Sequence, residues 1–277
     1  MLASSLLCPH CQQQLEFATA QRKTLSCHQG HRFDAAKQGY YNFLTGKGTN
    51  FTEDTAAMVA ARAEFQTRGH YQPLATAITQ AASQGAVNPT RILDAGAGTG
   101  YYLSELVENL GVPDTEAVAL DISRYAMRRA AKVQHTTAIV WDVWRTLPSA
   151  DASRDLVLNC FAPHNPKEFR RVLAPGGLCL VVTALPDHLQ QVREPLGMLG
   201  IAEAKQDQLI ARFGDHDLRL DNVQELRFDM SLDPQDLFNL AFMGPAGHHL
   251  DPDELRHRVN RIGTQEVRAA FGIYSFV

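Results

Sequence analysis

One stretch of the sequence combines a carboxylate with three glycines, Asp94-Ala95-Gly96-Ala97-Gly98-Thr99-Gly100. Glycines are needed where the backbone turns sharply and where a ligand must approach more closely than a side chain would allow. A dinucleotide site has the spacing G-x-G-x-x-G and binds a pyrophosphate, whereas here an acid stands before the first glycine. A carboxylate at that place repels phosphate, so the stretch predicts a binding loop for a cationic ligand.

This order of acid and glycines resembles motif I of the class I S-adenosylmethionine methyltransferases, whose cofactor carries an amino group and a sulfonium. The resemblance implies cofactor contacts at Asp94, Gly96, Gly98 and Gly100. A glycine turn with no ligand is the alternative, because small glycine loops recur in α/β folds.

A second group of residues has the spacing of a metal site. Cys8-Pro9-His10-Cys11 is followed, after fifteen residues, by Cys27-His28-Gln29-Gly30-His31, which gives the pattern C-x2-C-x15-C-x3-H. Four ligands at this spacing fit tetrahedral zinc, and a site closed by four protein groups predicts a structural ion rather than a catalytic one. Unpaired thiols of a cytosolic protein are the alternative.

Three histidines compete for the fourth ligand position. His10 and His28 each stand directly beside a cysteine, from which a side chain usually points away, whereas Gly30 allows the turn before His31. The predicted ligands are Cys8, Cys11, Cys27 and His31. About 35 residues cannot build a stable core alone, so we expect the metal to supply folding free energy to this segment.

Positive charge is concentrated in the same segment. Residues 1–50 hold five Lys/Arg against two Asp/Glu, a formal charge of +3, which leaves −7 for the rest of a chain whose net charge is −4. The basic residues are Arg22, Lys23, Arg32, Lys37 and Lys47. Phe33, Tyr40 and Phe43 lie among them, and such a mixture can contact phosphates and stack on unpaired RNA bases. A solvated surface for the charges, and packing of the module for the rings, are equally compatible with the sequence.

The remaining sequence alternates between strand and helix patterns. Strands are predicted at 91–95, 116–120, 137–141, 155–160 and 178–184, with helices between them at 101–110, 123–133 and 165–173. Helices at 53–68 and 71–84 precede them, and strands at 218–228 and 267–277 follow, around a helix at 233–242 and another that begins at Asp251. This alternation predicts an α/β, Rossmann-like fold with a doubly wound and mainly parallel sheet.

Ligands of such sheets lie at the carboxyl ends of the strands, which here carry Asp94, Asp121, Asp142 and Asn159. Asp121 comes 21 residues after Gly100, a spacing at which a carboxylate can accept both ribose hydroxyl protons. Asp142 closes the third strand and is placed to accept a hydrogen bond from the adenine amino group. Helix capping is the alternative for Asp121, because aspartates at strand ends commonly cap the following helix.

The composition is that of an ordinary soluble globular protein, with 45% hydrophobic and 20% charged residues among 277. No apolar run approaches the roughly 20 residues of a membrane helix, and the first residues lack a secretory signal, so we predict a cytoplasmic protein without a membrane span. We expect the chain to divide into an N-terminal zinc module, 1–44, and a larger methyltransferase domain, 45–277. Cys160 and Cys179 stand in apolar runs and are predicted to be buried in strands.

Several segments together resemble one family, the RlmA family of 23S ribosomal RNA (guanine-N1)-methyltransferases. They are the zinc pattern, Phe33-Asp34 with Gln38-Gly39-Tyr40, Gly69-His70-Tyr71-Gln72-Pro73-Leu74, Asp94 to Gly100, and Phe161-Ala162-Pro163. Asp142-Val143-Trp144 and Met243-Gly244-Pro245, among others, look more like the branch associated with tylosin-type macrolide resistance. The resemblance extends over nearly the whole chain.

The resemblance implies an S-adenosylmethionine-dependent enzyme that methylates N1 of a guanine in a hairpin loop of 23S rRNA. It implies cofactor contacts at Tyr71, Gly98, Thr99 and His188, RNA contacts by the zinc module, and a homodimer. From the residues alone, Tyr71 at a helix start would be assigned to packing and His188 after a strand to a solvated cap.

Guanine N1 carries a proton at neutral pH and is a poor nucleophile until that proton is lost. We expect Asn159 and the backbone near Phe161 to hold the guanine edge, with the Phe161 ring stacked on the base after it leaves the loop. Strand capping by Asn159 and a core position for Phe161 are the alternatives, and no residue is identified as the base. A non-catalytic RNA-binding protein, and a methyltransferase for a small molecule or a protein, remain open as other functions.

Overall fold

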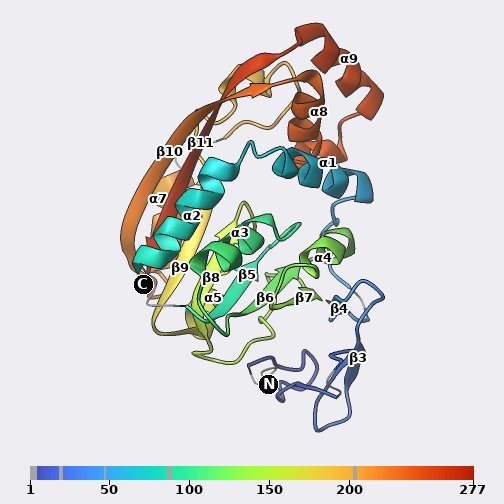
Figure 1. The fold of residues 1–277 in the computed structure, drawn as a ribbon. Helices are drawn as coiled ribbons and strands as arrows, with labels where there is room; N and C mark the ends of the chain where they lie inside the picture. Colours follow the sequence, from blue (N-terminus) through green and yellow to red (C-terminus); the bar gives the residue numbers. More distant parts are fainter. Residues whose placement is uncertain (1–4, 19–20, 47, 86–88, 202–204) are drawn as a thin grey trace.

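The computed structural model describes residues 5–18, 21–46, 48–85, 89–201 and 205–277. Within these ranges the chain forms a three-stranded sheet near the N-terminus and an eight-stranded sheet flanked by helices (Figure 1). The small sheet lies at one end of the molecule, and helices α8 (Pro234–Phe242) and α9 (Pro252–Ile262) lie at the other.

The N-terminal module is a small antiparallel sheet followed by a strand that leaves it. β1 (Glu16–Phe17), β2 (Thr24–Ser26) and β3 (Arg32–Asp34) pair in that order. β4 (Tyr41–Asn42) pairs in parallel with β7 (Thr136–Val140) of the large sheet. β4 lies within the expected module, which ends at residue 44, and β7 lies in the larger domain. The two parts therefore share backbone hydrogen bonds.

The large sheet has the strand order β10-β11-β9-β8-β5-β6-β7-β4. Its other strands are β5 (Arg91–Ala95), β6 (Glu116–Asp121), β8 (Arg154–Cys160), β9 (Leu173–Ala184), β10 (Leu220–Leu232) and β11 (Gln265–Phe276). The strands from β4 to β9 pair in parallel, whereas β10 and β11 run antiparallel at one edge. This topology confirms the predicted α/β class and the mainly parallel sheet.

The remaining helices are α1 (Ala56–Thr67), α2 (Gln72–Gly85), α3 (Tyr101–Leu110), α4 (Arg124–Ala130), α5 (Pro166–Val172), α6 (Gln190–Arg193) and α7 (Lys205–Gly214), with a 3-10 turn at Pro245–His248. α4 is shorter than the predicted 123–133, because it ends at Ala130 with Ala131 as its C-cap and because Ser123 is its N-cap, which accepts a hydrogen bond from the N–H of Ala126. Asp251 caps α9 as expected. Among the described residues, none of the helices combines the length and apolar character that a bilayer span requires.

Two apolar layers cover the two faces of the sheet, because successive side chains of a strand point to opposite faces. In β8, Leu156 and Leu158 pack in the layer that contains residues of α2, α3 and α4. Val157 packs in the layer that contains residues of α5, α7 and the N-terminal module. Cys160 and Cys179 are buried in strands as predicted. The carboxyl ends of the parallel strands therefore emerge between two covered faces.

Candidate active site and metal centre

The glycine loop turns directly after β5, and each of its three glycines has a positive φ: 89° at Gly96, 54° at Gly98 and 79° at Gly100. A Cβ on Gly96 would lie 2.2 Å from the Cβ of Ala162, and one on Gly100 would lie 3.0 Å from the Cα of Ala130. The first and third glycines therefore allow the loop to pack closely against its neighbours.

Asp121, at the end of β6, ties the glycine loop to the next strand. Its Oδ2 accepts a hydrogen bond from the N–H of Gly98 (2.9 Å), and its Oδ1 accepts one from the N–H of Ser123 (2.8 Å). Burial raises the pKa of the Asp121 carboxyl, while these two N–H groups act in the opposite direction. The hydroxyl that caps α4 comes from Ser123, so the capping role considered for Asp121 belongs to its neighbour.

Asp94 lies within β5 with only 3% of its surface exposed, and among the described residues its carboxylate forms no hydrogen bond. Burial, and next the charge of Asp121, raise its pKa to about 8. A buried carboxylate without a donor is costly when ionised. The position therefore favours a cationic ligand, which would restore the ionised form.

Asp142 follows β7 and is also nearly buried. Its Oδ2 accepts a hydrogen bond from the hydroxyl of Thr49 (2.7 Å), and its Oδ1 accepts one from the N–H of Trp144 (3.0 Å). Each carboxylate oxygen has a second acceptor position, so these contacts leave Asp142 able to accept a further hydrogen bond. The structure thus brings the three predicted acids to adjacent strand ends.

Residues 49–66, which we call the strap, run across these strand ends. Its polar contacts are Thr49 with Asp142, Glu53 with the N–H of Arg124, the Asp54 carbonyl with the Ser123 hydroxyl, and Gln66 with the Thr99 hydroxyl (2.6 Å). A cavity of about 270 Å³ reaches Thr99 and Gly100, but none of the three acids lines it. In this conformation the strap covers the strand ends of β5, β6 and β7.

Tyr71 and His188 lie together although 117 residues separate them. Both rings pack against Phe271, with ring centroids 5.2 and 4.6 Å away. Nδ1 of His188 accepts a hydrogen bond from the N–H of Ala270 (3.1 Å), and burial lowers the His188 pKa to about 3. The ring is therefore neutral at physiological pH with its proton on Nε2, which makes His188 a donor and not a base.

Asn159 is fully buried at the end of β8, and its side chain is engaged within the protein. Nδ2 donates hydrogen bonds to the carbonyls of Ala95 (2.6 Å) and Pro163 (3.1 Å), while Oδ1 lies 2.7 Å from Nδ1 of His164. These contacts hold the loop after β8 against the end of β5. In this conformation the arrangement gives Asn159 a positioning role for the loop that carries Phe161.

Phe161 is 46% exposed and has a φ of 53°, which is unusual for a residue with a side chain. One side of its ring meets Tyr102 (6.1 Å) and Phe271 (5.4 Å) between centroids. An aromatic side chain half in solvent at a strand's carboxyl end is not a core residue. It is available to stack on a flat ligand.

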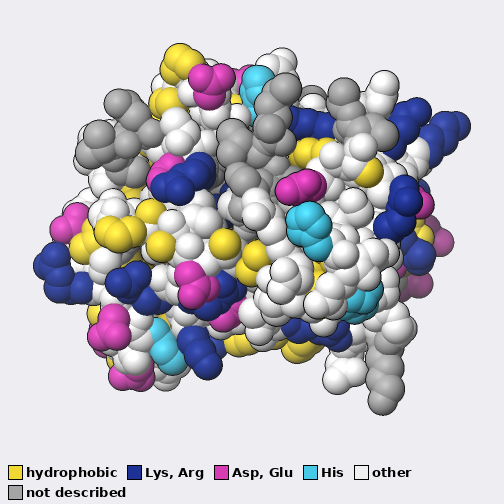
Figure 2. Space-filling view, turned by 90° about the horizontal axis from the view of Figure 1, so that it is seen from below, with side chains coloured by type: hydrophobic (Ala, Val, Ile, Leu, Met, Phe, Trp, Pro, Cys, Tyr) yellow, Lys and Arg dark blue, Asp and Glu magenta, His cyan; other side chains and the backbone are white. Residues whose placement is uncertain are grey.

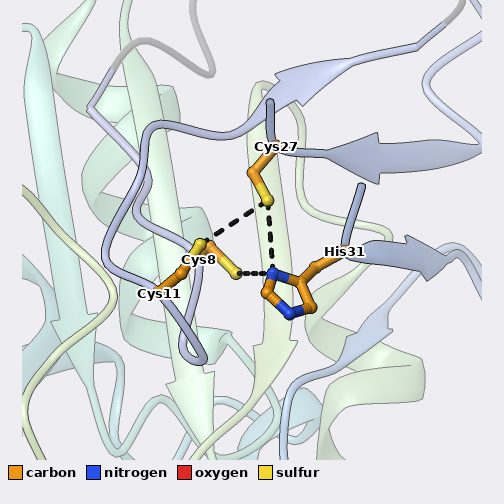
Figure 3. A group of neighbouring side chains, drawn as sticks. All are labelled: Cys8, Cys11, Cys27 and His31. Carbon is orange, nitrogen blue, oxygen red and sulfur yellow. Dashed lines mark hydrogen bonds between the residues drawn. The ribbon is translucent and has the colours of Figure 1, made fainter. Parts of the chain in front are cut away.

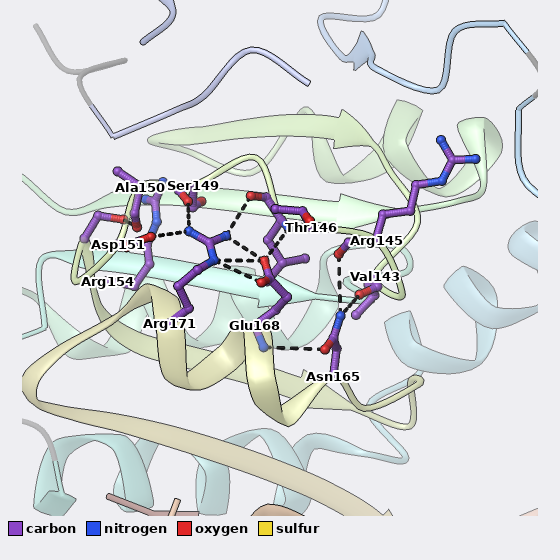
Figure 4. Close-up of polar contacts among 12 residues, drawn as sticks. Val143, Arg145, Thr146, Ser149, Ala150, Asp151, Arg154, Asn165, Glu168 and Arg171 are labelled. Carbon is purple, nitrogen blue, oxygen red and sulfur yellow. Dashed lines mark hydrogen bonds and ion pairs between the residues drawn. The ribbon is translucent and has the colours of Figure 1, made fainter. Parts of the chain in front are cut away.

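A network of hydrogen bonds, partly buried, ties α5 to the loop that follows Asp142 (Figure 4). Nδ2 of Asn165, the N-cap of α5, donates to the carbonyl of Val143 (2.8 Å). Oε2 of Glu168 accepts from the N–H of Leu147 (2.7 Å), and Arg171 donates to the carbonyl of Ser149 (2.7 Å). Residues of α5 and its N-cap thus connect the loop after Asp142 with the segment that follows Phe161.

The four predicted metal ligands converge in the N-terminal module (Figure 3). Nδ1 of His31 lies 3.6 Å from Sγ of Cys8 and 3.4 Å from Sγ of Cys27, and the sulfurs of Cys11 and Cys27 are 3.6 Å apart. Tetrahedral zinc with Zn–S bonds of about 2.3 Å places neighbouring ligand atoms roughly 3.5–3.8 Å apart. The three distances are close to this range, and all four ligand atoms lie within 4.8 Å of one another, so the cluster has the size that one zinc ion requires.

The rival histidines and the aromatic residues of the module have other partners. His10 is 3.2 Å from the hydroxyl of Thr45, and His28 is exposed outside the cluster. Phe33, Tyr40 and Phe43 are each at most 9% exposed. These rings pack the module onto the larger domain, which decides between the two interpretations that the sequence left open.

The predicted basic residues of the module are at its surface. Arg22, Lys23, Arg32 and Lys37 are exposed, while Lys47 lies outside the described residues. Figure 2 shows that Lys and Arg side chains on the face drawn there are interspersed with Asp and Glu and form no single continuous patch. Contact with an anionic partner would therefore rest on individual side chains.

Two residues that contact the predicted site residues escaped the sequence reasoning: Thr49 and Gln66. On α1, Met58 and Phe65 mark the buried face, and Gln66 is buried beside them at 8% exposure. A polar residue next to an apolar stripe of a helix was the available signal. Thr49 stands in a turn-rich segment and offers no such pattern.

Two sequence families match parts of the chain. The family described as "RlmA, N-terminal", a zinc ribbon, matches residues 6–46. A family described as "Methyltransferase domain" matches residues 92–177. The first match contains the metal cluster, and the second contains the glycine loop, Asp121, Asp142 and Phe161.

Similar proteins match over almost the full length. A Streptomyces fradiae protein, a 23S rRNA (guanine(748)-N(1))-methyltransferase, is 40% identical over 95% of this chain and 92% of its own length. A Micromonospora griseorubida protein assigned the 23S rRNA (guanine-N(1)-)-methyltransferase activity is 38% identical over 93% of this chain and 92% of its own.

Solved structures support the fold. A chain in the complex between the Haloferax volcanii Trm112 methyltransferase activator and a methyltransferase aligns with a TM-score of 0.52 over 80% of this chain and 94% of its own, at 20% identity. A methyltransferase of an antibiotic biosynthesis pathway from Anabaena variabilis aligns with a TM-score of 0.50 over 73% of this chain and 97% of its own, at 16% identity.

Proposed function

The chain belongs to the RlmA family of 23S rRNA (guanine-N1)-methyltransferases, and we propose that it transfers the methyl group of S-adenosylmethionine to N1 of a guanine in a hairpin loop of that RNA. The observation that carries the proposal is the convergence of Asp94, Asp121 and Asp142 around the glycine loop, beside an exposed aromatic ring. Family membership covers both the zinc module and this site.

The residues present fit S-adenosylmethionine. Asp94 is a nearly buried carboxylate without a donor, which suits the positive charge of the cofactor. Asp121 is proposed to accept from the ribose hydroxyls and Asp142 from the adenine amino group, with Gly96, Gly98, Thr99 and Gly100 lining the path between them. Tyr71 and His188 are proposed to contact the cofactor as well. When bound, the cofactor supplies an electrophilic methyl group on a sulfonium.

The guanine is proposed to lie on Phe161. Its half-exposed ring stands at the carboxyl end of β8, beside the glycine loop, because Ala162 packs against Gly96. Asn159 holds this loop in place, and the backbone near Phe161 offers groups to the guanine edge. Holding N1 in line with the methyl group supplies much of the acceleration in such a displacement.

The module is proposed to hold one structural zinc ion, through Cys8, Cys11, Cys27 and His31, and to dock the RNA. The ligand distances fit that ion. The module also pairs directly with the active-site domain, because the N–H of Leu7 donates to the carbonyl of Pro148 and that of Ala150 donates to Ser5. Zinc would therefore fix the docking surface relative to the methyl-transfer site.

The test is mapping of 23S rRNA methylation in cells with and without the gene. A methyl group on N1 blocks the Watson–Crick edge, so reverse transcription should stop at one guanine only when the protein is present, and mass spectrometry should identify 1-methylguanine there. A purified protein that binds S-adenosylmethionine but leaves the RNA unmodified would indicate a small-molecule or protein substrate instead. Binding of RNA without cofactor would indicate a non-catalytic protein.

The guanine equivalent to position 748 is the proposed target, from the similar Streptomyces fradiae enzyme. Resistance to tylosin-type macrolides would follow from methylation there, and growth inhibition with and without the gene measures it. A homodimer in the cytoplasm is proposed from the resemblance to the family, and light scattering of the purified protein together with cell fractionation tests it.

A further inference from the structure

We propose that Arg62 binds the carboxylate of the cofactor's methionyl group. The inference rests on the proposed use of S-adenosylmethionine and goes beyond it, because it assigns a residue of the strap to the end of the cofactor that carries negative charge.

The geometry places the Arg62 guanidinium over the glycine loop. Its Nη1 is the atom nearest to the position that a Cβ on Gly98 would take, at 3.6 Å. The positive charge of Arg62 also acts against burial in setting the pKa of both Asp121 and Tyr102. The 3.6 Å approach to Gly98 is therefore the observation that places the guanidinium against the loop, and its effect on Asp121 and Tyr102 is consistent with that position.

The two ends of the guanidinium have different partners. Nη2 donates to the carbonyl of Met243 (2.6 Å) and is 2.6 Å from Oδ2 of Asp54. Among the described residues, Nη1 forms no hydrogen bond, although a guanidinium has five N–H donors in a fixed fork. The contacts of Nη2 thus hold the group in place while Nη1 is directed toward the loop with its donors unused.

The charges of the site and the cofactor are complementary only if such a cation takes part. Asp94, Asp121 and Asp142 suit an amino group, a sulfonium and hydroxyl donors, but each of them repels a carboxylate. Of the cationic side chains described in the structure, Arg62 is the one found against Gly98, the middle glycine of the loop. Arginine binds carboxylates through parallel hydrogen bonds, which makes it well suited to this end of the ligand.

A purely structural role is the competing explanation, since Arg62 connects α1 with the segment after α8. Removing a structural contact would lower the affinity for every ligand of the site equally. Removing a carboxylate partner would weaken only ligands that carry the carboxylate. Decarboxylated S-adenosylmethionine keeps the adenosine, the sulfonium and the amino group, so it separates the two explanations.

The experiment is calorimetric titration of the full chain with both compounds. We expect the wild type to prefer S-adenosylmethionine over the decarboxylated compound by about 10- to 100-fold, the range of a charge-assisted hydrogen bond. In Arg62→Gln the preference should nearly vanish, while affinity for the decarboxylated compound changes less than about threefold. Arg62→Met, which keeps the apolar stem, gives the same readout if the glutamine variant does not fold.

Arg68→Gln is the matched control. Arg68 caps the same helix and pairs with Asp233 and Asp236 at 2.9 Å, so it ties α1 to α8, and within the described part of the chain it forms no hydrogen bond or ion pair with the glycine loop. This variant should retain the full preference. If Arg62→Gln lost the same affinity for both compounds, or kept the wild-type preference, the inference about Arg62 would be overturned, but the proposed function would not. A wild type that binds neither compound would overturn the proposed function as well.

Discussion

The N–H of Gly98 donates a hydrogen bond to Oδ2 of Asp121 at 2.9 Å, so the carboxylate expected to hold the ribose also holds the glycine loop. The same side chain accepts from the N–H of Ser123 through Oδ1. A carboxylate has about four acceptor positions, which leaves two for ribose hydroxyls. Asp121 therefore has two roles, because it holds the glycine loop in place and is expected to bind the ribose.

Substitution of Asp121 should separate these two contributions. Asp121→Asn keeps one acceptor but loses the charge and leaves one backbone N–H unpaired, so affinity for S-adenosylmethionine should fall by about 1.5–3 kcal/mol with a smaller loss of stability than in the alanine variant. Asp121→Ala leaves two backbone N–H groups unpaired and should also lower stability, by about 1–3 kcal/mol. Calorimetry and thermal unfolding measure the two effects. The zinc content of both variants should remain that of the wild type, and equal cofactor affinity in all three proteins would refute the assignment.

Asp94→Asn should stabilise the cofactor-free protein and abolish tight cofactor binding. The folded pKa of about 8 lies above the unfolded value of 3.8, so the folded state binds this proton more tightly. The associated stability is fully present below the unfolded pKa and is lost as the pH rises toward the folded one, by up to about 1.4 kcal/mol per pH unit. The melting temperature of the wild type should therefore fall relative to Asp94→Asn between about pH 5 and pH 8. A constant difference across this range would contradict the raised pKa.

Cofactor binding should release the proton that Asp94 holds in the cofactor-free protein. A cationic ligand favours the ionised form of Asp94, so binding below pH 8 releases a proton and affinity should rise with pH, by up to about tenfold per unit. Titrations in two buffers of different ionisation enthalpy at about pH 7 measure the proton released. Asp94→Asn is the control and should release none from this position.

The sequence predicted most of the large sheet because each parallel strand is an apolar run that ends at a polar residue. Asp94, Asp121 and Asn159 mark those ends, and the structure places them as expected. α7 was missed because Leu209 and Phe213 are its buried apolar residues and too few for a clear helical pattern. β4 was missed because two residues cannot signal a strand without the partner that pairs with them.

Within the site, local motifs were predictable and long-range contacts were not. The zinc spacing and the glycine loop are short enough to be recognised from residue types alone. Arg62 contacts Met243, which is 181 residues away, and its place over Gly98 depends on how α1 packs. One partner of Asn159, the carbonyl of Ala95, likewise comes from the end of another strand. Such roles follow only from tertiary structure.

Cys27→Ser should lose bound zinc and lower the melting temperature. Zinc ligation is coupled to folding in modules that lack a sufficient core, so incomplete ligation should loosen the three short strands. Elemental analysis of the purified protein should give well below one zinc per chain. His28→Ala is the matched control because His28 is exposed and lies outside the cluster. A fully loaded Cys27→Ser protein would show that this cysteine is not a ligand.

The exposed Lys and Arg side chains of the module should contribute to RNA affinity without affecting the affinity for the cofactor. Substituting Lys23, Arg32 and Lys37 by glutamine should weaken binding of the hairpin RNA and lower the slope of log affinity against log salt by about two, if each contacts one phosphate. Affinity for S-adenosylmethionine should not change. Filter binding at several salt concentrations gives the slope.

A triple variant of Arg256, Arg258 and Arg261 on α9 is the control for that experiment. It removes the same charge from the opposite end of the molecule (Figure 1). If the module docks the RNA, this variant should keep the wild-type slope. If the module variant instead melts at a lower temperature while it retains full RNA affinity and the original slope, the lysines and the arginine cover apolar surface and do not dock RNA.

Phe161→Ala should lower the rate of RNA methylation while leaving cofactor affinity and stability nearly unchanged. Base stacking on an aromatic ring contributes about 1–3 kcal/mol, so kcat/KM for the RNA should fall about 5- to 150-fold. The ring is 46% exposed, and removal of a half-exposed side chain should cost less than about 1 kcal/mol of stability. Methylation of the hairpin RNA by the purified protein, with calorimetry for S-adenosylmethionine, measures both.

Phe161→Trp and the buried Phe271→Leu complete the test of this stack. Tryptophan keeps a flat surface for the base, so this variant should retain most of the methylation rate. Phe271 is fully buried and supports Phe161, Tyr71 and His188, so its loss should reduce stability and cofactor affinity together. If Phe161→Ala behaved like Phe271→Leu, with both ligand affinities and the melting temperature reduced, Phe161 would be part of the packing of the site. A selective loss of methylation, restored by tryptophan, is the result expected for a ring that receives the guanine.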